Sequence, residues 1–242
     1  MNPGQSGNRP TLSAARLFSG ISLPTPLPDV PARFLFQTTD PVTNAVVGQA
    51  NTPVDIDENN GLQSYVVAFE PLAPFPPTDV RMLCRCANAH AADTIPGVNT
   101  LLLSASLDPV PDLVALAATI GRDGIVDIPG LGGTGVFSIA TVNLGASAMI
   151  TATADTGSGQ IPVSVSICET DPATSACLAA PVDAAVGDTT TIGANETPTF
   201  GVFLSSDEAI PFDPANARIF VRFTDGGGVV RGATSVAVQT VP

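Results

Sequence analysis

The residues best suited to catalysis are Asp155-Thr156-Gly157-Ser158, which have the sequence of an aspartic-protease active-site loop. In those enzymes two carboxylates share a proton and activate a water molecule, so two such loops are needed. No second Asp-Thr-Gly occurs in this chain, and only a homodimer would supply the partner. Because the flanking residues alternate as strands do, we expect a hairpin turn from Asp155 to Gly159. We therefore expect no catalytic site there.

A glycine-rich stretch, Gly130 to Gly135, satisfies the dinucleotide fingerprint in form. A dinucleotide site also needs a helix after the glycines, because the N-terminus of that helix holds the pyrophosphate. The residues that follow, Val136 to Gly145, are rich in β-branched side chains and end in another glycine. This pattern indicates a strand, so we expect an interstrand loop.

Asp55, Asp57 and Asn59 carry oxygen ligands in the alternating order of a calcium loop. The remaining EF-hand pattern is missing, because Gly61 stands one place late and Val66 occupies the twelfth position, where the EF-hand has Glu. These three residues are the candidate calcium site, and a solvated polar turn is the alternative. We expect no other cofactor.

Cys84, Cys86 and the only histidine, His90, are a second group with the side chains of metal ligands. An internal repeat, described below, places the two cysteines at the positions of Val221 and Phe223. We therefore expect both thiols to face a core as small hydrophobic groups. The single histidine also excludes an ordinary Ser-His-Asp triad, unless it alone serves as the base.

Cys168 and Cys177 flank a turn, at the end of one strand and the start of the next. In antiparallel neighbours their Cβ atoms come within reach of each other. We expect a disulfide between them, which implies an oxidising compartment.

Composition restricts the class of protein. The 242 residues have a net charge of −13, and all nine basic residues are Arg. Such a surface repels phosphate backbones and anionic lipid, and no run approaches the length of a membrane span, so we expect neither nucleic-acid binding nor membrane insertion. Gly and Pro are spread along the chain, which favours many short strands over long helices.

An internal repeat is the firmest pattern in the chain. The turn from Thr39 to Ala45 shares five of its seven residues with the turn from Thr170 to Ala176. Farther along, Tyr65 to Phe69 matches Phe200 to Phe203 in the same order. Ordered matches with small changes of offset at loops are typical of a duplicated domain.

The repeat predicts three regions: a Pro/Gly-rich N-terminal arm with one short strand (1–30), a shorter β-sandwich (31–106) and a complete one (107–242). The second copy has three additional strands, 113–119, 125–128 and 136–143, for which the first copy has no room. A sandwich without its opening strands exposes unpaired edge groups. Either the chain is a fragment of a longer surface protein, or a strand from a neighbouring subunit fills the gap.

The best strand of each copy carries two arginines on the face opposite its apolar residues. These outward residues, which form the candidate interface, are Arg81 and Arg85 in the first copy and Arg218, Phe220 and Arg222 in the second. Arg and aromatic side chains are frequent anchors of protein interfaces. The alternative is pairing within the chain with acidic neighbours such as Asp207, Glu208 or Asp225.

The spacing of strands and turns resembles the tandem immunoglobulin-like and fibronectin-III-like modules of bacterial secreted and cell-surface proteins. The resemblance covers 107–242 well and 31–106 less well, and the Cys…Trp…Cys hallmark is absent because the chain has no Trp. It implies an all-β fold of two Ig-like antiparallel sandwiches related by duplication, the first incomplete, with a scaffold, adhesive or spacer role.

We therefore expect a non-catalytic extracellular structural protein, a filament or surface-layer subunit that forms a homo-oligomer or polymer by strand donation. The alternative is an adhesive or carbohydrate-binding module of a larger secreted protein, with a glycan or cell-surface component as its partner. The first residues, from Met1 to Gly7, lack the pattern of a secretory signal. Either the protein is cytoplasmic, or Met1 is not the natural start.

Overall fold

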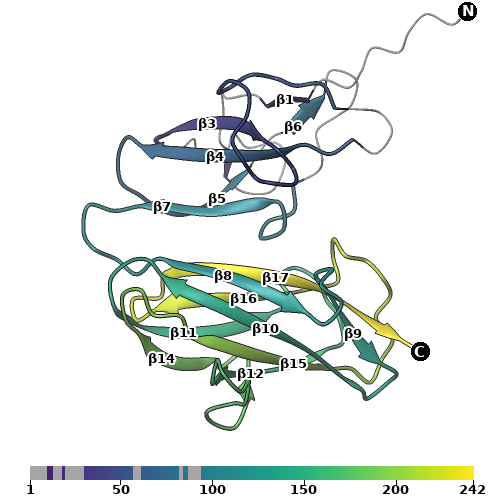
Figure 1. Ribbon diagram of the computed structural model, residues 1–242. Helices are drawn as coiled ribbons and strands as arrows, with labels where there is room; N and C mark the ends of the chain where they lie inside the picture. Colours follow the sequence, from purple (N-terminus) through teal and green to yellow (C-terminus); the bar gives the residue numbers. More distant parts are fainter. Residues whose placement is uncertain (1–9, 13–17, 20–29, 57–60, 82–83, 87–93) are drawn as a thin grey trace, which may run out of the picture. The chain divides into compact units, whose positions relative to one another are not determined.

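The computed structural model describes residues 10–12, 18–19, 30–56, 61–81, 84–86 and 94–242, which form strands and turns without a helix (Figure 1). A helix that is long and apolar enough to span a membrane is therefore absent from these residues. The chain divides into two compact units, Met1–Ala105 (unit 1) and Ser106–Pro242 (unit 2), and each is described by itself. The predicted all-β fold class is confirmed.

Unit 2 is a sandwich of two five-stranded sheets. The first sheet has the order β13 (Val182–Asp183), β12 (Ser164–Thr170), β15 (Thr199–Ser205), β10 (Thr134–Asn143), β8 (Leu113–Thr119). The second has the order β14 (Asp188–Ile192), β11 (Ala148–Asp155), β16 (Arg218–Asp225), β17 (Val230–Val241), β9 (Ile125–Pro129). The strands β8, β9 and β10 are the three additional strands that the sequence predicted.

The strand order is that of an immunoglobulin-like sandwich. In chain order, β8, β10, β12 and β15 take the places of strands A, B, D and E, and they lie in one sheet as A-B-E-D. The strands β11, β16 and β17 take the places of C, F and G in the other sheet. Every pair is antiparallel except β17 with β9, which is parallel. Short β9 therefore continues strand A along the second sheet.

Alternating side chains build the core of unit 2. In β16 the side chains of Ile219, Val221 and Phe223 are fully buried, while Arg218, Phe220 and Arg222 between them face outward, as the sequence predicted. The Phe223 ring lies 5.3 Å from the ring of Phe200 on β15, so these aromatic side chains join the two sheets.

Unit 1 has shorter sheets and a smaller core. The strands β3 (Ala32–Thr39) and β4 (Ser64–Pro71) form one pair, and β5 (Phe75–Arg81) lies between β2 (Phe18–Ser19) and β7 (Thr100–Ala105). The strand β6 (Cys84–Cys86) pairs with β1 (Pro10–Leu12). Its buried hydrophobic cluster is built on Val30 and Val80, with partly buried side chains such as Phe34 and Phe69 around them.

In unit 1 the sequence also predicts strands over Val54–Ile56 and Val80–Cys86, and the structure differs at both. The strand predicted over Val80–Cys86 begins earlier, at Phe75, and its last part is the separate strand β6. The segment Val54–Ile56 forms no strand and has only a single bridge residue, Ile56. The backbone N–H and side chain of Asn51 already bond to Phe36, so the edge of β3 that this segment would join is occupied.

The repeated turn has the same structure in both units. Asp40 N donates to Ala45 O (2.8 Å), and Asp171 N donates to Ala176 O (2.9 Å). The sixth residue of the turn has a positive φ in each copy, 57° at Asn44 and 59° at Ser175. The turns agree in conformation as well as in sequence.

The strand before the turn and the strand that follows it also pair in the same register in both units. In unit 1, Thr39 lies opposite Ser64 and Phe36 opposite Val67; in unit 2, Thr170 lies opposite Thr199 and Ile167 opposite Val202. Thus β3 and β4 take the places of strands D and E of unit 1. These agreements are what a duplication predicts, and the duplication itself stays a prediction.

The N-terminal arm pairs within its own unit. It contributes two short strands, β1 and β2, where the sequence predicted one. Thr11 of β1 lies opposite Arg85, as Thr153 of β11 lies opposite Arg222. Because β11 is strand C of unit 2, β1 fills the place of strand C in unit 1.

Candidate functional site

The Asp-Thr-Gly segment is a structural turn. Asp155 Oδ1 accepts a hydrogen bond from Gly157 N (2.6 Å), and Asp155 Oδ2 pairs with the Arg222 guanidinium. Strands β11 and β12 on either side belong to different sheets, so the turn crosses the sandwich and is not the predicted hairpin. The carboxylate is thereby committed to an Asx turn and an ion pair, which leaves it poorly placed to activate water.

The glycine-rich stretch joins two strands. Strand β9 ends at Pro129 and β10 begins at Thr134, without a helix after the glycines. A Cβ added at Gly133 would lie only 1.9 Å from the backbone oxygen of Pro129, so the chain turns too tightly there for a side chain. The interstrand loop predicted from the sequence is confirmed, and the stretch lacks the helix N-terminus that a dinucleotide site needs.

The candidate metal groups lie mostly outside the described residues. Asp55 is exposed, but Asp57, Asn59 and His90 lie outside this part of the chain. Cys84 lies on β6, in a stretch where only the backbone is described. Among the described residues, His, Cys, Asp and Glu side chains do not gather in groups of three that could hold a metal ion. The calcium site therefore stays a prediction.

The predicted disulfide joins Cys168 and Cys177 across the repeated turn of unit 2, with their Cα atoms 5.7 Å apart. The turn is also held by Asp171, whose Oδ1 accepts hydrogen bonds from the backbone N of Ala173 (2.8 Å) and Thr174 (2.9 Å). The hydrogen bonds from the backbone N of Thr174 and of Ala173 hold the pKa of this carboxyl below its usual value.

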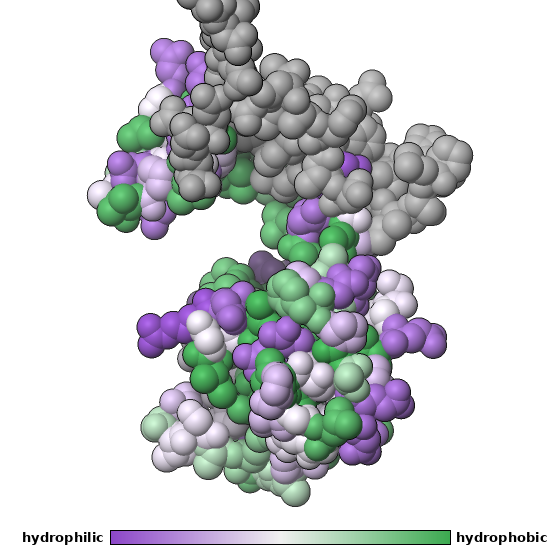
Figure 2. Space-filling view, turned by 90° about the vertical axis from the view of Figure 1, so that its right-hand side faces the viewer, coloured by the Kyte–Doolittle hydropathy of each residue, from purple (hydrophilic) through white to green (hydrophobic). Residues whose placement is uncertain are grey.

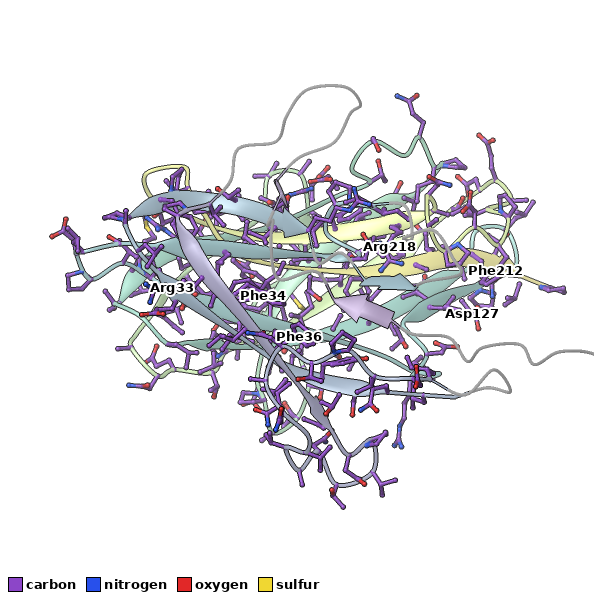
Figure 3. All side chains as sticks on the ribbon, turned by 90° about the horizontal axis from the view of Figure 1, so that it is seen from above. Arg33, Phe34, Phe36, Asp127, Phe212 and Arg218 are labelled. Atoms are coloured by element: carbon purple, nitrogen blue, oxygen red, sulfur yellow. A yellow bond between two sulfur atoms is a disulfide. The ribbon has the colours of Figure 1, made fainter. Side chains whose placement is uncertain are left out.

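The outward arginines of unit 2 have partners within the chain. Arg218, labelled in Figure 3, donates to Pro214 O (2.7 Å) and to Ser235 Oγ (2.9 Å), and burial lowers its pKa. Arg222 pairs with Asp155, and its guanidinium lies 5.5 Å from the centre of the Phe220 ring. The acidic partners differ from the expected ones, because Asp225 bonds Arg231 (2.7 Å).

The two candidate interface arginines of unit 1 lie on consecutive strands, β5 and β6. Arg81 ends β5, lies opposite Thr100 and is partly exposed, while Arg85 belongs to β6, whose side chains are not described. In unit 2 the corresponding pair is Arg218 opposite Ala237. Each of these residues lies 137 positions after its counterpart in unit 1, Arg81 or Thr100, so the two pairs have the same register. Whether these five outward residues make an interface stays a prediction.

The sequence did not indicate which strand of unit 1 would have an open edge. In the described structure it is β4, which takes the place of strand E. In unit 2 the equivalent strand, β15, has β12 on one side and β10 on the other. In unit 1, β4 pairs with β3 only, and no described strand lies on its other side. The arm fills the place of strand C, so the places of strands A and B are the ones left open in the described structure.

Side chains on the core face of β4 are less covered than their counterparts. Phe200, Val202 and Leu204 of β15 are fully buried. The equivalent residues of β4 are Tyr65, Val67 and Phe69, and all three remain partly exposed. On the neighbouring strand, Phe34 and Phe36 stack with their ring centres 6.2 Å apart (Figure 3). The lower burial of these β4 side chains accompanies the lack of a second described strand beside β4.

A second open edge lies on β8, strand A of unit 2, which pairs with β10 only. Its sequence, Leu-Val-Ala-Leu-Ala-Ala-Thr, has no charge, Gly or Pro. Its outward side chains include Leu116, which is 68% exposed. Elsewhere on unit 2, hydrophobic and hydrophilic residues are interspersed over the face seen in Figure 2. An uncharged apolar edge is a ready template for another strand.

No protein-family model matches this chain, and no curated protein matches it. Among solved structures, it is similar to AvmM, which catalyses macrocyclization in alchivemycin A biosynthesis (16% identity, TM-score 0.33, covering 54% of this chain and 90% of AvmM). It is also similar to a variant of BcpA, the major pilin subunit of Bacillus cereus (15% identity, TM-score 0.28, covering 88% of this chain and 66% of BcpA). A third similar structure is the CupB6 tip adhesin from Pseudomonas aeruginosa (11% identity, TM-score 0.28, covering 100% of this chain and 87% of the adhesin). At these TM-scores the likenesses carry no argument about function.

Proposed function

We propose that this protein is a non-catalytic structural subunit that self-associates through its sandwich units into a filament or surface layer outside the cytoplasm. The observation that carries the proposal is the open edge of β4, at the place where unit 2 has strand β10. A sandwich that lacks a strand gains backbone hydrogen bonds and buries core side chains when another chain supplies one.

The roles of the residues best suited to catalysis support a structural protein. Asp155 is engaged in a turn and an ion pair, and the stretch Gly130 to Gly135 is a tight interstrand connection. A nucleophile with an adjacent base and a stabilising group is the least that an active site requires. The described parts of the chain do not bring such a set together.

The disulfide supports an oxidising location. Cys168 is almost fully buried beside the turn that the disulfide closes. Disulfides persist in secreted and surface proteins, whereas cytosolic reductants keep thiols reduced. The proposal therefore places the assembled protein outside the cytoplasm, and fractionation of the source cells tests this part of it.

The test is the mass of the purified full chain over a range of concentrations, measured by light scattering, with electron microscopy of the same samples. We expect ordered oligomers that grow with concentration from the 24.4 kDa monomer. A chain that remains monomeric at every concentration would contradict the proposal.

A further inference from the structure

We propose that strand β8 of one copy adds to the open edge of β4 in the next copy, so that the chains assemble head to tail. The inference rests on the proposed function and deepens it, because it names the partner as a second copy of this chain and assigns the two surfaces that meet. Each surface belongs to a strand that has a described neighbour on one side only, β3 for β4 and β10 for β8.

The backbone of β4 points toward the open side at alternate residues. On β3, the backbone oxygens of Thr38 and Phe36 accept bonds from Val47 N and Asn51 N, so these residues face away from β4. Phe36 lies opposite Val67. In an antiparallel pair such residues do not bond each other, so the N–H and C=O of Val67 point to the open edge.

Unit 2 shows what belongs at that edge. The residue equivalent to Val67 is Val202, which lies opposite Phe137 of β10 in an antiparallel ladder. That ladder covers seven residues of β15, from Thr199 to Ser205. The acceptor edge on β4 is therefore shaped for an extended, apolar strand of about the same length.

The β8 edge has the matching chemistry. Asp112 O accepts a hydrogen bond from Leu144 N, which follows β10. In an antiparallel pair alternate residues bond the same neighbour, so the backbone groups of Val114 and Leu116 also point toward β10. Ala115 and Ala117 alternate with these residues, and their N–H and C=O groups point to the open side. The strand has seven residues, against eight in β4.

Other outer strands of unit 2 are protected in ways that β8 is not. Strand β9 contains Asp127 and ends at Pro129, β14 begins with Asp188, and β13 has only two residues. Charge, Pro and shortness are the usual means by which natural sheets prevent pairing at their edges. Since β8 has none of them, it is the strand of unit 2 best suited to join another sheet.

Pairing of β8 with β4 also matches their outer faces. Leu116 projects from β8 on its outer face, and Val66, which is 44% exposed, projects from β4 on the outer face of its sheet. Joining the strands would extend one sheet and bring such apolar side chains together. The contact joins two different surfaces, so a dimer formed by one such contact still has one free β8 edge and one free β4 edge, and further copies can add to it.

The experiment uses two variants of the full chain that each place a charge on one edge. Leu116→Lys changes β8, and Leu131→Lys, at 66% exposed in the turn before β10, is its matched control. Val66→Lys changes β4, and Val98→Lys, at 38% exposed in a loop, is its control. Circular dichroism and the fluorescence of Tyr65, the only tyrosine, confirm that each variant is folded.

We expect each edge variant alone to be monomeric while both controls assemble like the original chain. A one-to-one mixture of the two edge variants should form dimers of twice the 24.4 kDa mass, because one supplies an intact β8 and the other an intact β4. Dimers from the mixture also show that neither variant had simply misfolded.

Other outcomes overturn the inference, and they separate it from the proposed function. If the original chain assembles and both edge variants assemble equally well, a different surface is used and only the inference fails. If Leu116→Lys blocks assembly and Val66→Lys does not, β8 of one copy pairs with β8 of another. If both variants are monomeric and their mixture also stays monomeric, β8 and β4 do not pair with each other. A monomeric original chain removes the proposed function and the inference together.

Discussion

Asp40 and Asp171 hold the same turn in the two units, and their carboxyl groups should titrate alike. Hydrogen bonds from the backbone N of Thr43 and of Val42 lower the pKa of Asp40, as those from Thr174 and Ala173 lower the pKa of Asp171. Because the folded pKa is lowered, each carboxylate stabilises the fold above the unfolded value of about 3.9. This contribution is lost as the pH falls through the folded pKa.

An NMR titration of the side-chain carboxyl carbons measures both pKa values directly. The control is Asp171→Asn, whose side-chain oxygen still accepts the hydrogen bonds but does not titrate. Loss of stability in acid should be shallower for this variant below about pH 4. Two ordinary pKa values would show that these hydrogen bonds are not kept in solution.

The disulfide should contribute measurably to unit 2. The bridge spans a sequence separation of 9 residues, and closing a loop of this size removes about 2.5 kcal/mol of unfolded-state entropy. The double substitution Cys168→Ala and Cys177→Ala should therefore lower the free energy of unfolding by about 2 kcal/mol. Urea denaturation followed by circular dichroism checks this, with the Tyr65 fluorescence of unit 1 as the internal control. Equal stability would mean that Asp171 alone holds the turn.

The two outward arginines of β16 should differ in their effect on stability. Arg218→Gln removes hydrogen bonds to Pro214 O and Ser235 Oγ from a partly buried guanidinium, so a loss of about 1–2 kcal/mol is expected. Arg222→Gln removes an ion pair with Asp155 that is one-third to one-half exposed, which contributes only about 0–1 kcal/mol. Denaturant unfolding of the two variants under the same conditions compares them. A larger loss for Arg222 would reverse this assignment of roles.

At the scale of the element, we expect the N-terminal arm to stabilise unit 1, because its strands pair within that unit. Its strands β1 and β2 pair with β6 and β5 of the same unit. Deletion of residues 1–19 should leave these strands with unpaired edges and lower the stability of unit 1. The chain has no Trp and a single tyrosine, Tyr65, so intrinsic fluorescence during urea unfolding follows unit 1 alone.

The circular dichroism transition of unit 2 is the control for that deletion and should not change. An unaltered Tyr65 transition would show that β1 and β2 do not support unit 1. Because β1 fills the place of strand C only, the deletion tests a different part of the gap from the edge of β4.

Strands were predictable where side chains alternate over a well-packed core, and less so elsewhere. Strand β16 was predicted from its alternation of arginine with Ile219, Val221 and Phe223. The start of β5 was predicted too late, because Pro76 and Pro77 are unfavourable in strands. Val54–Ile56 does not form the predicted strand, because Asn51 already bonds to the edge of β3 that this segment would join. A short stretch of sequence determines how readily its residues form a strand. The pairing of that strand depends on whether another strand, distant in the chain, has an edge without a partner.

At the scale of the whole molecule, the sequence predicted two sandwiches of unequal length but did not indicate which strand positions would lack a strand. Offsets such as that between Asp40 and Asp171 fix which residues are equivalent, and they indicated that the first copy lacks opening strands. That the arm fills one of these positions, and that β4 keeps an open edge, required the strand pairs. The pairing of Pro10–Leu12 with Cys84–Cys86 joins short segments far apart in the chain, and short segments carry little pairing information.

Charge is distributed unequally between the two units, and this gives a test of which surface drives assembly. Unit 1 has five arginines and eight acidic residues, a net charge of −3, while unit 2 has four arginines and fourteen acidic residues, a net charge of −10. Two copies therefore repel each other at low ionic strength. Raising NaCl from about 0.01 M to about 1 M shortens the screening length from about 30 Å to about 3 Å.

The direction of the salt effect separates the two candidate surfaces. If the uncharged β8 edge joins β4, screening removes repulsion and leaves the backbone bonds and apolar contacts intact, so assembly should increase with salt. If the arginines of β16 meet acidic residues of the next copy, screening removes the attraction and assembly should decrease. Sedimentation at several NaCl concentrations measures this, with Leu116→Lys as the control that should stay monomeric throughout. Assembly that weakens steadily as salt rises would favour the arginine face and count against the β8 edge.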